Sequence, residues 1–196
     1  MFPIHSFSPK VDRSDLQRVI AELDTCPLKN SGIRVVYSIG DGSSGIMLIG
    51  EAPGAKEDEL GEPFVGAAGN LLNRELLPSA GLTRKNIYLT NIVKCRPPQN
   101  RDPSEEEKLA WSPVLMLEIA MIRPKIVACL GRHSLNFFLP QAKISKVHGE
   151  ALPIKVFADL EVYLLPLYHP AAALYNPGMK QILLEDFAKL GQMKLK

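Results

Sequence analysis

Cysteine is scarce in this chain of 196 residues, and the three that occur, Cys26, Cys95 and Cys129, are an odd number. An odd count excludes a framework in which every cysteine is paired, as in small secreted proteins. The N-terminus also lacks the pattern of a signal peptide. We therefore expect a protein of the reducing cytoplasm.

Long hydrophobic runs and a strong charge of either sign are missing too. No apolar run reaches the roughly 20 residues that a transmembrane helix needs, so we expect no contact with a membrane. The formal net charge is only +2, which leaves any nucleic-acid contact to a local basic patch. With 46% hydrophobic residues and no internal repeat, residues 1–196 are predicted to form a single domain, and we expect a monomer.

Short apolar runs alternate with segments of helical periodicity. The expected strands are 46–49, 87–91, 125–130 and 162–166, and the expected helices are 14–24, 67–80, 103–122, 132–139 and 179–190. Asp102, as a cap before Pro103, predicts the start of the helix over 103–122. Residues 143–154 are predicted to be a polar loop with hairpin character. The alternation predicts an α/β fold with a mostly parallel sheet and helices on both faces.

Residues suited to binding or chemistry follow each expected strand. Residues 50–54, Asn91, Gly131 and His169 stand at or just after four strand ends. In a parallel sheet these ends lie on one edge, which is where open α/β sheets bind ligands. Segments far apart in the sequence are therefore predicted to converge on one cleft.

Four side chains in that cleft have the chemistry to remove a pyrimidine base from its sugar. Glu51 can orient a water molecule or stabilise a cation, and His169 can donate to an oxygen that gains negative charge. Phe64 can stack on a flat ring, and the amide of Asn91 can pair with the polar edge of a base. Three of them have a structural alternative, since Asn91 could be a turn residue, Phe64 a core side chain and His169 a surface histidine. Their placement on successive strand ends favours the functional interpretation.

Several motifs follow one another along the chain: Gly50-Glu-Ala-Pro-Gly54, Pro63-Phe-Val-Gly66, Thr90-Asn-Ile-Val-Lys-Cys-Arg-Pro-Pro98, Asn100-Arg-Asp-Pro103, Arg123-Pro124 and Tyr168-His-Pro170. Over about residues 20–190 they closely resemble, in content and order, the family 4 uracil-DNA glycosylases of bacteria and archaea. The resemblance implies a three-layer α/β/α sandwich with a central four-stranded parallel sheet. It also implies excision of uracil from deaminated DNA without cleavage of the backbone.

The resemblance implies roles for single residues. Glu51 would handle the water or the sugar cation, and His169 would stabilise the uracil anion through its O2 oxygen. Phe64 would stack on uracil, and Asn91 would hydrogen-bond its polar edge. The residues implied in uracil binding are Glu51, Ala52, Pro53, Gly54, Phe64, Asn91 and His169.

Contacts to DNA are expected from loops beside the cleft. The side chains predicted to bind phosphates are Lys94, Arg96, Arg101 and Lys146. Any one of these charges could equally belong to a solvated loop. By resemblance, residues 170–176 would enter the duplex where the nucleotide leaves, with Leu174 or Tyr175 as the wedge.

The chain departs from the family pattern at one place. The family usually binds a [4Fe–4S] cluster through four cysteines. Here Cys26 and Cys95 match two of the positions, whereas Leu23 and Trp111 stand at the other two. A register that starts at Cys26 puts Lys29 at the second position, which is no ligand either. Because two thiolates cannot complete the ligand set, we expect no cluster and no other metal, with Leu23 and Trp111 packed in its place.

The range of bases stays open at this point. Asn91 favours uracil in DNA as the substrate, with free uracil as a product of base excision repair. A glycosylase for hypoxanthine or xanthine is an alternative, and so is a non-catalytic DNA-binding homologue that lost its activity with its cluster. The presence of Glu51, Asn91 and His169 argues against the last.

Overall fold

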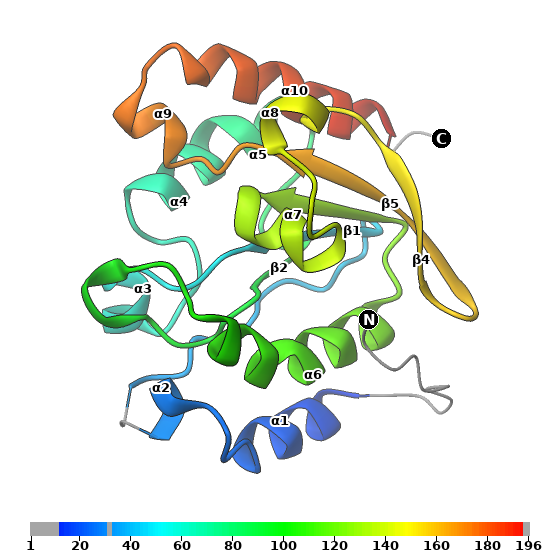
Figure 1. Ribbon diagram of the computed structural model, residues 1–196. Coiled ribbons are helices and arrows are strands. Elements are labelled where there is room, and N and C mark those ends of the chain that lie inside the picture. The colour runs from blue at the N-terminus through cyan, green and yellow to red at the C-terminus, as the bar shows by residue number, and fades with distance from the viewer. Residues whose placement is uncertain (1–11, 31–32, 194–196) are drawn as a thin grey trace.

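A computed structural model describes residues 12–30 and 33–193 of the chain. Figure 1 shows a sheet with helices packed around it. The sheet has five strands in the order β2-β1-β3-β5-β4, and β4 alone among them is antiparallel to its neighbour. The strands are β1 (Ile46–Gly50), β2 (Tyr88–Asn91), β3 (Ile126–Leu130), β4 (Leu152–Phe157) and β5 (Leu160–Leu167).

Helices cover both faces of the sheet and make three layers (Figure 1). One face carries α6 (Glu105–Ile122) and α7 (Arg132–Phe138), with α1 (Arg13–Ala21) packed on α6. The other face carries α10 (Met179–Met193) and the continuous helical segment of α4 (Ala67–Leu71), η1 (Leu72–Leu76) and α5 (Leu77–Ser79). The shorter helices are α2 (Pro27–Asn30), α3 (Ala55–Leu60), η2 (Pro98–Asn100), α8 (Ile144–Val147) and α9 (Ala172–Tyr175).

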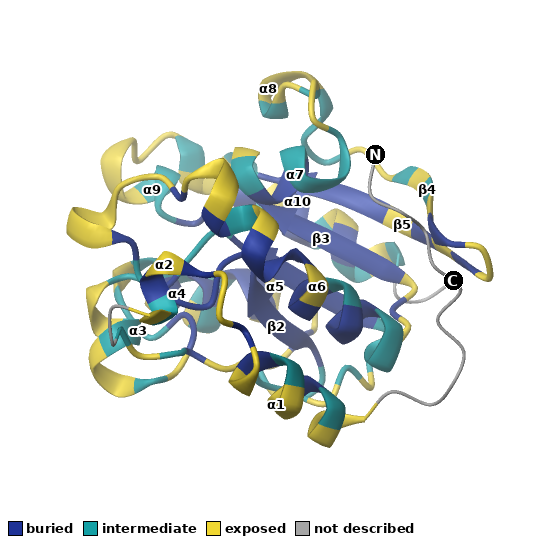
Figure 2. Cartoon of the chain, turned by 60° about the horizontal axis from the view of Figure 1, so that its bottom comes forward, coloured by how far each residue is buried: buried dark blue, intermediate teal, exposed yellow. Residues whose placement is uncertain are grey.

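Alternate residues of the central strands belong to two separate hydrophobic cores, one on each face of the sheet. In β1, Met47 and Ile49 belong to the core under α6, whereas Ile46 and Leu48 belong to the core under α10. Side chains of a strand alternate between its faces, so a strand covered on both sides is apolar at every position. Figure 2 shows these strands as the buried centre of the molecule.

The predicted α/β sandwich with four parallel strands is confirmed, and the strand count needs a correction. The fifth strand, β4, begins inside residues 143–154, which were predicted to be a loop. Its first four residues alternate between half-buried and exposed, and Pro153 lies among them. Proline lacks the N–H that a central strand needs, so it is tolerated at an edge such as this one. Pro153 and Lys155 interrupt the apolar residues of this edge strand, so it does not show the continuous apolar run by which the other four are recognised.

The start of α6 also differs from the prediction. Its cap is Ser104 and not Asp102: Ser104 Oγ accepts from the backbone N–H of Glu107 at 3.1 Å, and Glu107 Oε2 accepts from the N–H of Ser104 at 2.8 Å. This reciprocal pair is a capping box. Asp102 therefore precedes the cap, and its carboxylate is free to bind side chains of α7.

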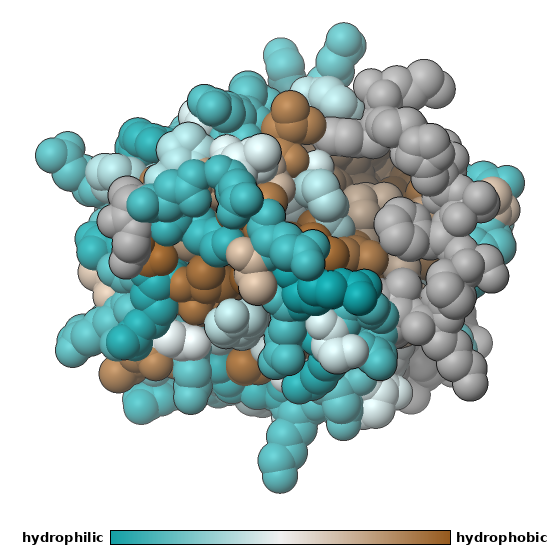
Figure 3. Space-filling view, turned by 90° about the horizontal axis from the view of Figure 1, so that it is seen from below, coloured by the Kyte–Doolittle hydropathy of each residue, from teal (hydrophilic) through white to brown (hydrophobic). Residues whose placement is uncertain are grey.

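The side that carries α1 shows a mixed surface where the described residues are visible. In the view from below, hydrophobic side chains lie in small areas between hydrophilic ones (Figure 3). Within residues 12–30 and 33–193, no helix combines the length and the apolar character that crossing a membrane requires.

The strand register brings the predicted strand ends together. Gly50 at the end of β1 pairs with Asn91 at the end of β2, and the N–H groups of Ile92 and Val93 donate to the carbonyls of Gly50 and Glu51 at 3.0 Å. On the other side, Gly131 N–H donates to the carbonyl of Leu167 at 2.8 Å. The residues that follow β1, β2, β3 and β5 therefore share one edge of the sheet.

Candidate active site

Asn91 and Phe64 meet at Gly50. A Cβ placed on Gly50 would lie 2.3 Å from Asn91 Oδ1 and 2.6 Å from Phe64 Cζ, so both side chains rest against this glycine. Asn91 is buried, and its Oδ1 has no hydrogen-bond partner within residues 12–30 and 33–193. A buried acceptor left unpaired costs about 1–3 kcal/mol. A ligand that donates an N–H to this oxygen would remove that cost.

The loop that carries Phe64 is held by side chains from outside it. Phe64 has a left-handed backbone, with φ +54°. Arg84 donates to the carbonyls of Phe64 at 3.0 Å and Pro63 at 2.9 Å, and Asn73 Nδ2 also donates to the carbonyl of Phe64 at 3.1 Å. Glu57 Oε1 accepts from the next two N–H groups at 2.8 Å. These contacts fix a backbone conformation that a phenylalanine rarely adopts and so fix the direction of its ring.

His169 lies beside Phe64, with ring centroids 5.9 Å apart and planes inclined by 32°. Burial lowers the pKa of His169 to about 4, against the opposing effect of Glu57, so the ring is neutral at neutral pH. Its Nδ1 accepts from the N–H of Ala171 at 3.2 Å. The single proton of the neutral ring is therefore on Nε2, which makes Nε2 a hydrogen-bond donor.

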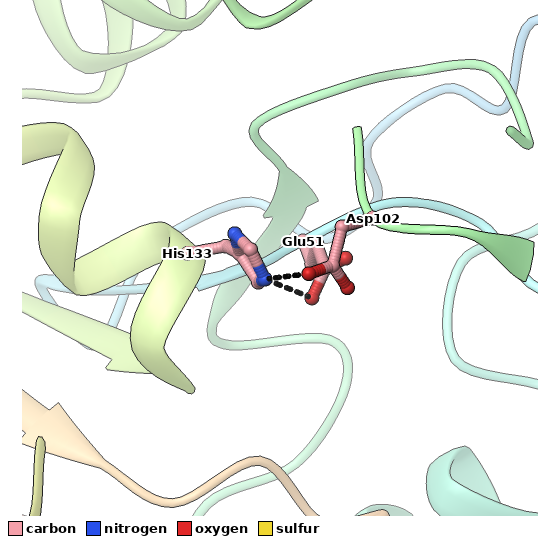
Figure 4. Close-up of side chains that lie close together, drawn as sticks. All are labelled: Glu51, Asp102 and His133. Carbon is pink, nitrogen blue, oxygen red and sulfur yellow. Dashed lines mark ion pairs between the residues drawn. The ribbon is translucent and has the colours of Figure 1, made fainter. Parts of the chain in front are cut away.

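Glu51 belongs to a second group of polar side chains at this edge (Figure 4). His133 Nε2 lies 3.2 Å from Asp102 Oδ2 and 3.7 Å from Glu51 Oε2. Arg132 donates from Nη2 to Asp102 Oδ2 at 2.6 Å and from Nε to His133 Nε2 at 2.9 Å. Arg132 therefore supplies positive charge directly beside Asp102.

The protonation states of this group follow from burial and from neighbouring charges. Burial raises the pKa of Glu51 to about 7, and the charge of Asp102 adds to the effect, whereas Arg132 and Lys108 oppose it. Burial lowers the pKa of His133. Burial opposes ionisation of Asp102, yet His133 and Arg132 together lower its pKa. Near neutral pH, Asp102 is ionised, His133 is mostly neutral, and Glu51 is divided between its two protonation states.

Comparison with known proteins identifies the family. The model of the uracil DNA glycosylase superfamily matches residues 37–190. The chain belongs to the uracil DNA glycosylase superfamily. It is 44% identical to a type-4 uracil-DNA glycosylase of Sulfurisphaera tokodaii over 87% of this chain and 79% of the relative. It is 40% identical to the Archaeoglobus fulgidus protein of the same name (91% and 92%) and 37% identical to that of Thermotoga maritima (90% and 94%). The predicted family is thus confirmed.

Several residues of this candidate site were missed by sequence reasoning. Arg84 and Glu57 fix the loop of Phe64, and Asp102, Arg132 and His133 surround Glu51. One signal could have found the last two, because Arg132 and His133 directly follow Gly131, which was predicted to lie at the ligand-binding edge. Asp102 stands in the Asn100-Arg-Asp-Pro103 motif, but was interpreted only as a helix cap. For Arg84 and Glu57 no comparable signal exists, since their partners belong to another loop.

Lys94 does not contact DNA as predicted, because it is buried. Its Nζ forms an ion pair with Glu118 at 2.7 Å and donates to the carbonyl of Asn91 at 2.6 Å. Burial lowers the pKa of Lys94, while Glu118 opposes this effect. Lys94 therefore stabilises the backbone at Asn91 through this hydrogen bond, and its buried ammonium group has no access to a phosphate.

The other residues predicted to bind DNA remain at the surface or near it. Arg96 donates to Asn100 Oδ1 at 2.8 Å, and Arg101 donates to both carboxylate oxygens of Glu107, at 2.6 and 2.9 Å. Lys146 on α8 is exposed. On α9, Leu174 is 49% exposed and Tyr175 is 89% exposed, so Tyr175 is the more protruding of the two predicted wedges.

The four positions of the family's iron–sulfur ligands lie in one hydrophobic core. Leu23, Cys26, Cys95 and Trp111 are all buried there, and Trp111 is fully enclosed. Burial, and secondarily the neighbouring Cys26, raises the pKa of Cys95 to about 12, which keeps its thiol protonated. A cluster needs thiolate ligands, and an indole and an isobutyl group offer none. This donor set does not fit a [4Fe–4S] cluster.

Proposed function

We propose that this protein is a uracil-DNA glycosylase of base excision repair, which hydrolyses the N-glycosidic bond of a uracil flipped out of DNA. One observation carries the proposal: the unpaired, buried amide oxygen of Asn91 lies beside the ring of Phe64 at Gly50. Uracil is flat and presents an N–H between two carbonyls. Its N–H can donate to Asn91 Oδ1 while its ring stacks on Phe64.

Two groups act on the bond that breaks. Negative charge develops on the leaving uracil, and the Nε2–H of His169 donates to its O2 oxygen. Glu51 takes a proton from the attacking water, and the backbone of residues 51–54 lines the uracil. A preorganised donor aimed at a developing oxyanion is worth about 3–4 kcal/mol of transition-state stabilisation.

The DNA is bound by residues around this pocket. We assign phosphate contacts to Arg96, Arg101 and Lys146, which lie on segments after β2 and before β4. Residues 170–176 enter the duplex, with Tyr175 or Leu174 filling the space of the flipped nucleotide. Their exposure supports this role, since an apolar wedge has to stand out of the surface.

The protein works without an iron–sulfur cluster, as a monomer of the cytoplasm. In place of the cluster, Leu23 and Trp111 join the N-terminal segment to α6 by apolar packing. Iron analysis of protein purified without oxygen tests the first claim. We expect less than one iron per chain, and about four per chain would contradict it.

A single assay tests the activity. A labelled duplex with one uracil is incubated with the protein and then treated with alkali, which cleaves DNA at abasic sites. Cleavage at the uracil supports the proposal, and an intact strand contradicts it. Duplexes with hypoxanthine or xanthine measure the range of bases, and binding without cleavage of any of them would identify a non-catalytic homologue.

A further inference from the structure

Several charged or titratable groups face the carboxyl group of Glu51 from different parts of the chain. Asp102 lies in the loop before α6, Lys108 on α6, and Arg132 and His133 on α7. His133 Nε2 is 3.2 Å from Asp102 Oδ2 and 3.7 Å from Glu51 Oε2, and a carboxylate oxygen of Asp102 lies within 4.8 Å of one of Glu51 (Figure 4). Asp102 is in turn fixed by Arg132 at 2.6 Å.

We propose that Asp102 is a positioning residue for uracil excision, whose negative charge beside Glu51 strengthens Glu51 as the base for the attacking water. The inference rests on the proposed function. As the water oxygen bonds to C1′ of the sugar, its proton moves to Glu51. The electron pair of the N-glycosidic bond leaves with the uracil.

The physical reason is the effect of one carboxylate on another. A free glutamate has a pKa of about 4.3 and is a poor proton acceptor from water near neutral pH. A second negative charge nearby makes protonation of the first carboxylate more favourable. Arg132 acts in the opposite direction, because its guanidinium offsets the charge of Asp102. The base strength of Glu51 therefore depends on the balance between these two residues.

The test is the pH dependence of single-turnover uracil excision in two variants, one that removes a negative charge near Glu51 and one that removes a positive charge. The rate should fall as Glu51 takes up a proton at low pH. Asp102→Asn removes the neighbouring negative charge, so we expect this fall to move to lower pH by about one unit and the plateau rate to drop about 3–10-fold. Arg132→Gln removes the positive charge, so the fall should move to higher pH.

The control is Asp159→Asn, which removes an exposed carboxylate paired with Arg123 at 3.1 Å in the turn between β4 and β5. It should leave the pH profile in place. Shifts in opposite directions for Asp102→Asn and Arg132→Gln support the inference. A rate reduced equally at every pH in both variants would assign Asp102 a merely structural role and overturn it. If the wild-type protein releases no uracil, the proposed function itself fails, so the two failures are told apart by wild-type activity.

Discussion

The ring of Phe64 lies 5.9 Å from the imidazole of His169, and the same ring reaches Gly50 beside the amide oxygen of Asn91. The side chain of Phe64 therefore lies close both to Asn91 at the end of β2 and to His169 just after β5. A flat base stacked on Phe64 would be within reach of an amide on one side and an imidazole N–H on the other. Both groups therefore lie close to the same aromatic ring.

His169→Ala should slow uracil excision by roughly 10²–10³-fold, because the variant loses the donor to the developing uracil anion. The measurement is single-turnover excision from a duplex with one uracil. Folding is checked by circular dichroism, so that a low rate can be ascribed to the site. A rate near that of the wild-type protein would remove His169 from the mechanism.

The low pKa of His169 predicts a dependence of stability on pH. The folded-state pKa is about 4, below the value of about 6.5 in the unfolded chain, so the unfolded chain binds more protons between these values. The contribution of His169 to the unfolding free energy therefore falls as pH falls from about 6.5 to about 4. Relative to His169→Gln, the wild-type protein should lose about 2 kcal/mol between pH 7.5 and about pH 5 in urea unfolding. An equal difference at both pH values would argue against a buried, neutral His169.

Gly50→Ala should disturb the site without replacing any side chain that contacts the uracil. Its Cβ would lie 2.3 Å from Asn91 Oδ1 and 2.6 Å from Phe64 Cζ, so both side chains must move. A misplacement of about 1 Å can cost about 10²-fold in rate, which is the loss we expect in single-turnover excision. The control is Gly81→Ala, whose Cβ meets nothing within 4 Å. That variant, with φ +63°, should lose about 1 kcal/mol of stability and keep its excision rate. Equal rates for the two variants would refute the close approach at Gly50.

The buried ion pair of Lys94 and Glu118 predicts a strong effect on stability. Lys94→Ala leaves the carboxylate of Glu118 buried and uncompensated, which should cost about 3–5 kcal/mol of unfolding free energy. The double variant Lys94→Met, Glu118→Leu removes both charges and should be clearly more stable than the single variant. Urea unfolding at neutral pH measures both. If Lys94→Ala is as stable as the wild-type protein, Lys94 is not buried with Glu118, and the original prediction of a surface lysine would stand.

The sequence predicts the parts of the site that depend on strand ends. Glu51, Asn91 and His169 each follow a short apolar run, and a parallel sheet places such ends on one edge whatever the details of packing. Phe64 lies in a loop, where its ring suggests a stacking role, and the resemblance of the residues around it to a known motif supports that role. Its actual direction is set by Arg84 and Glu57, from other parts of the chain.

The wrong predictions for Lys94 and Asp102 have a common physical cause. The position of each side chain depends on a partner that is distant in sequence. Lys94 lies in the loop after β2, two residues before Arg96, and nothing near it in sequence reveals that Glu118 on α6 is its partner. Asp102 has the pattern of a helix cap, but Ser104 takes that role and leaves Asp102 to bind Arg132. Such pairings depend on how α6 and α7 pack on the sheet, and the local sequence pattern does not predict them.

The most direct test compares uracil release by the wild-type protein and by Asn91→Leu, which keeps the size of the side chain and removes its amide. Single-turnover excision from a duplex with one uracil should proceed in the wild-type protein. It should fall by about 10²-fold or more in the variant, because a site built to hydrogen-bond its substrate depends strongly on that bond. Equal rates in the two proteins, or no release of uracil by the wild-type protein, would contradict a pocket that recognises uracil through Asn91.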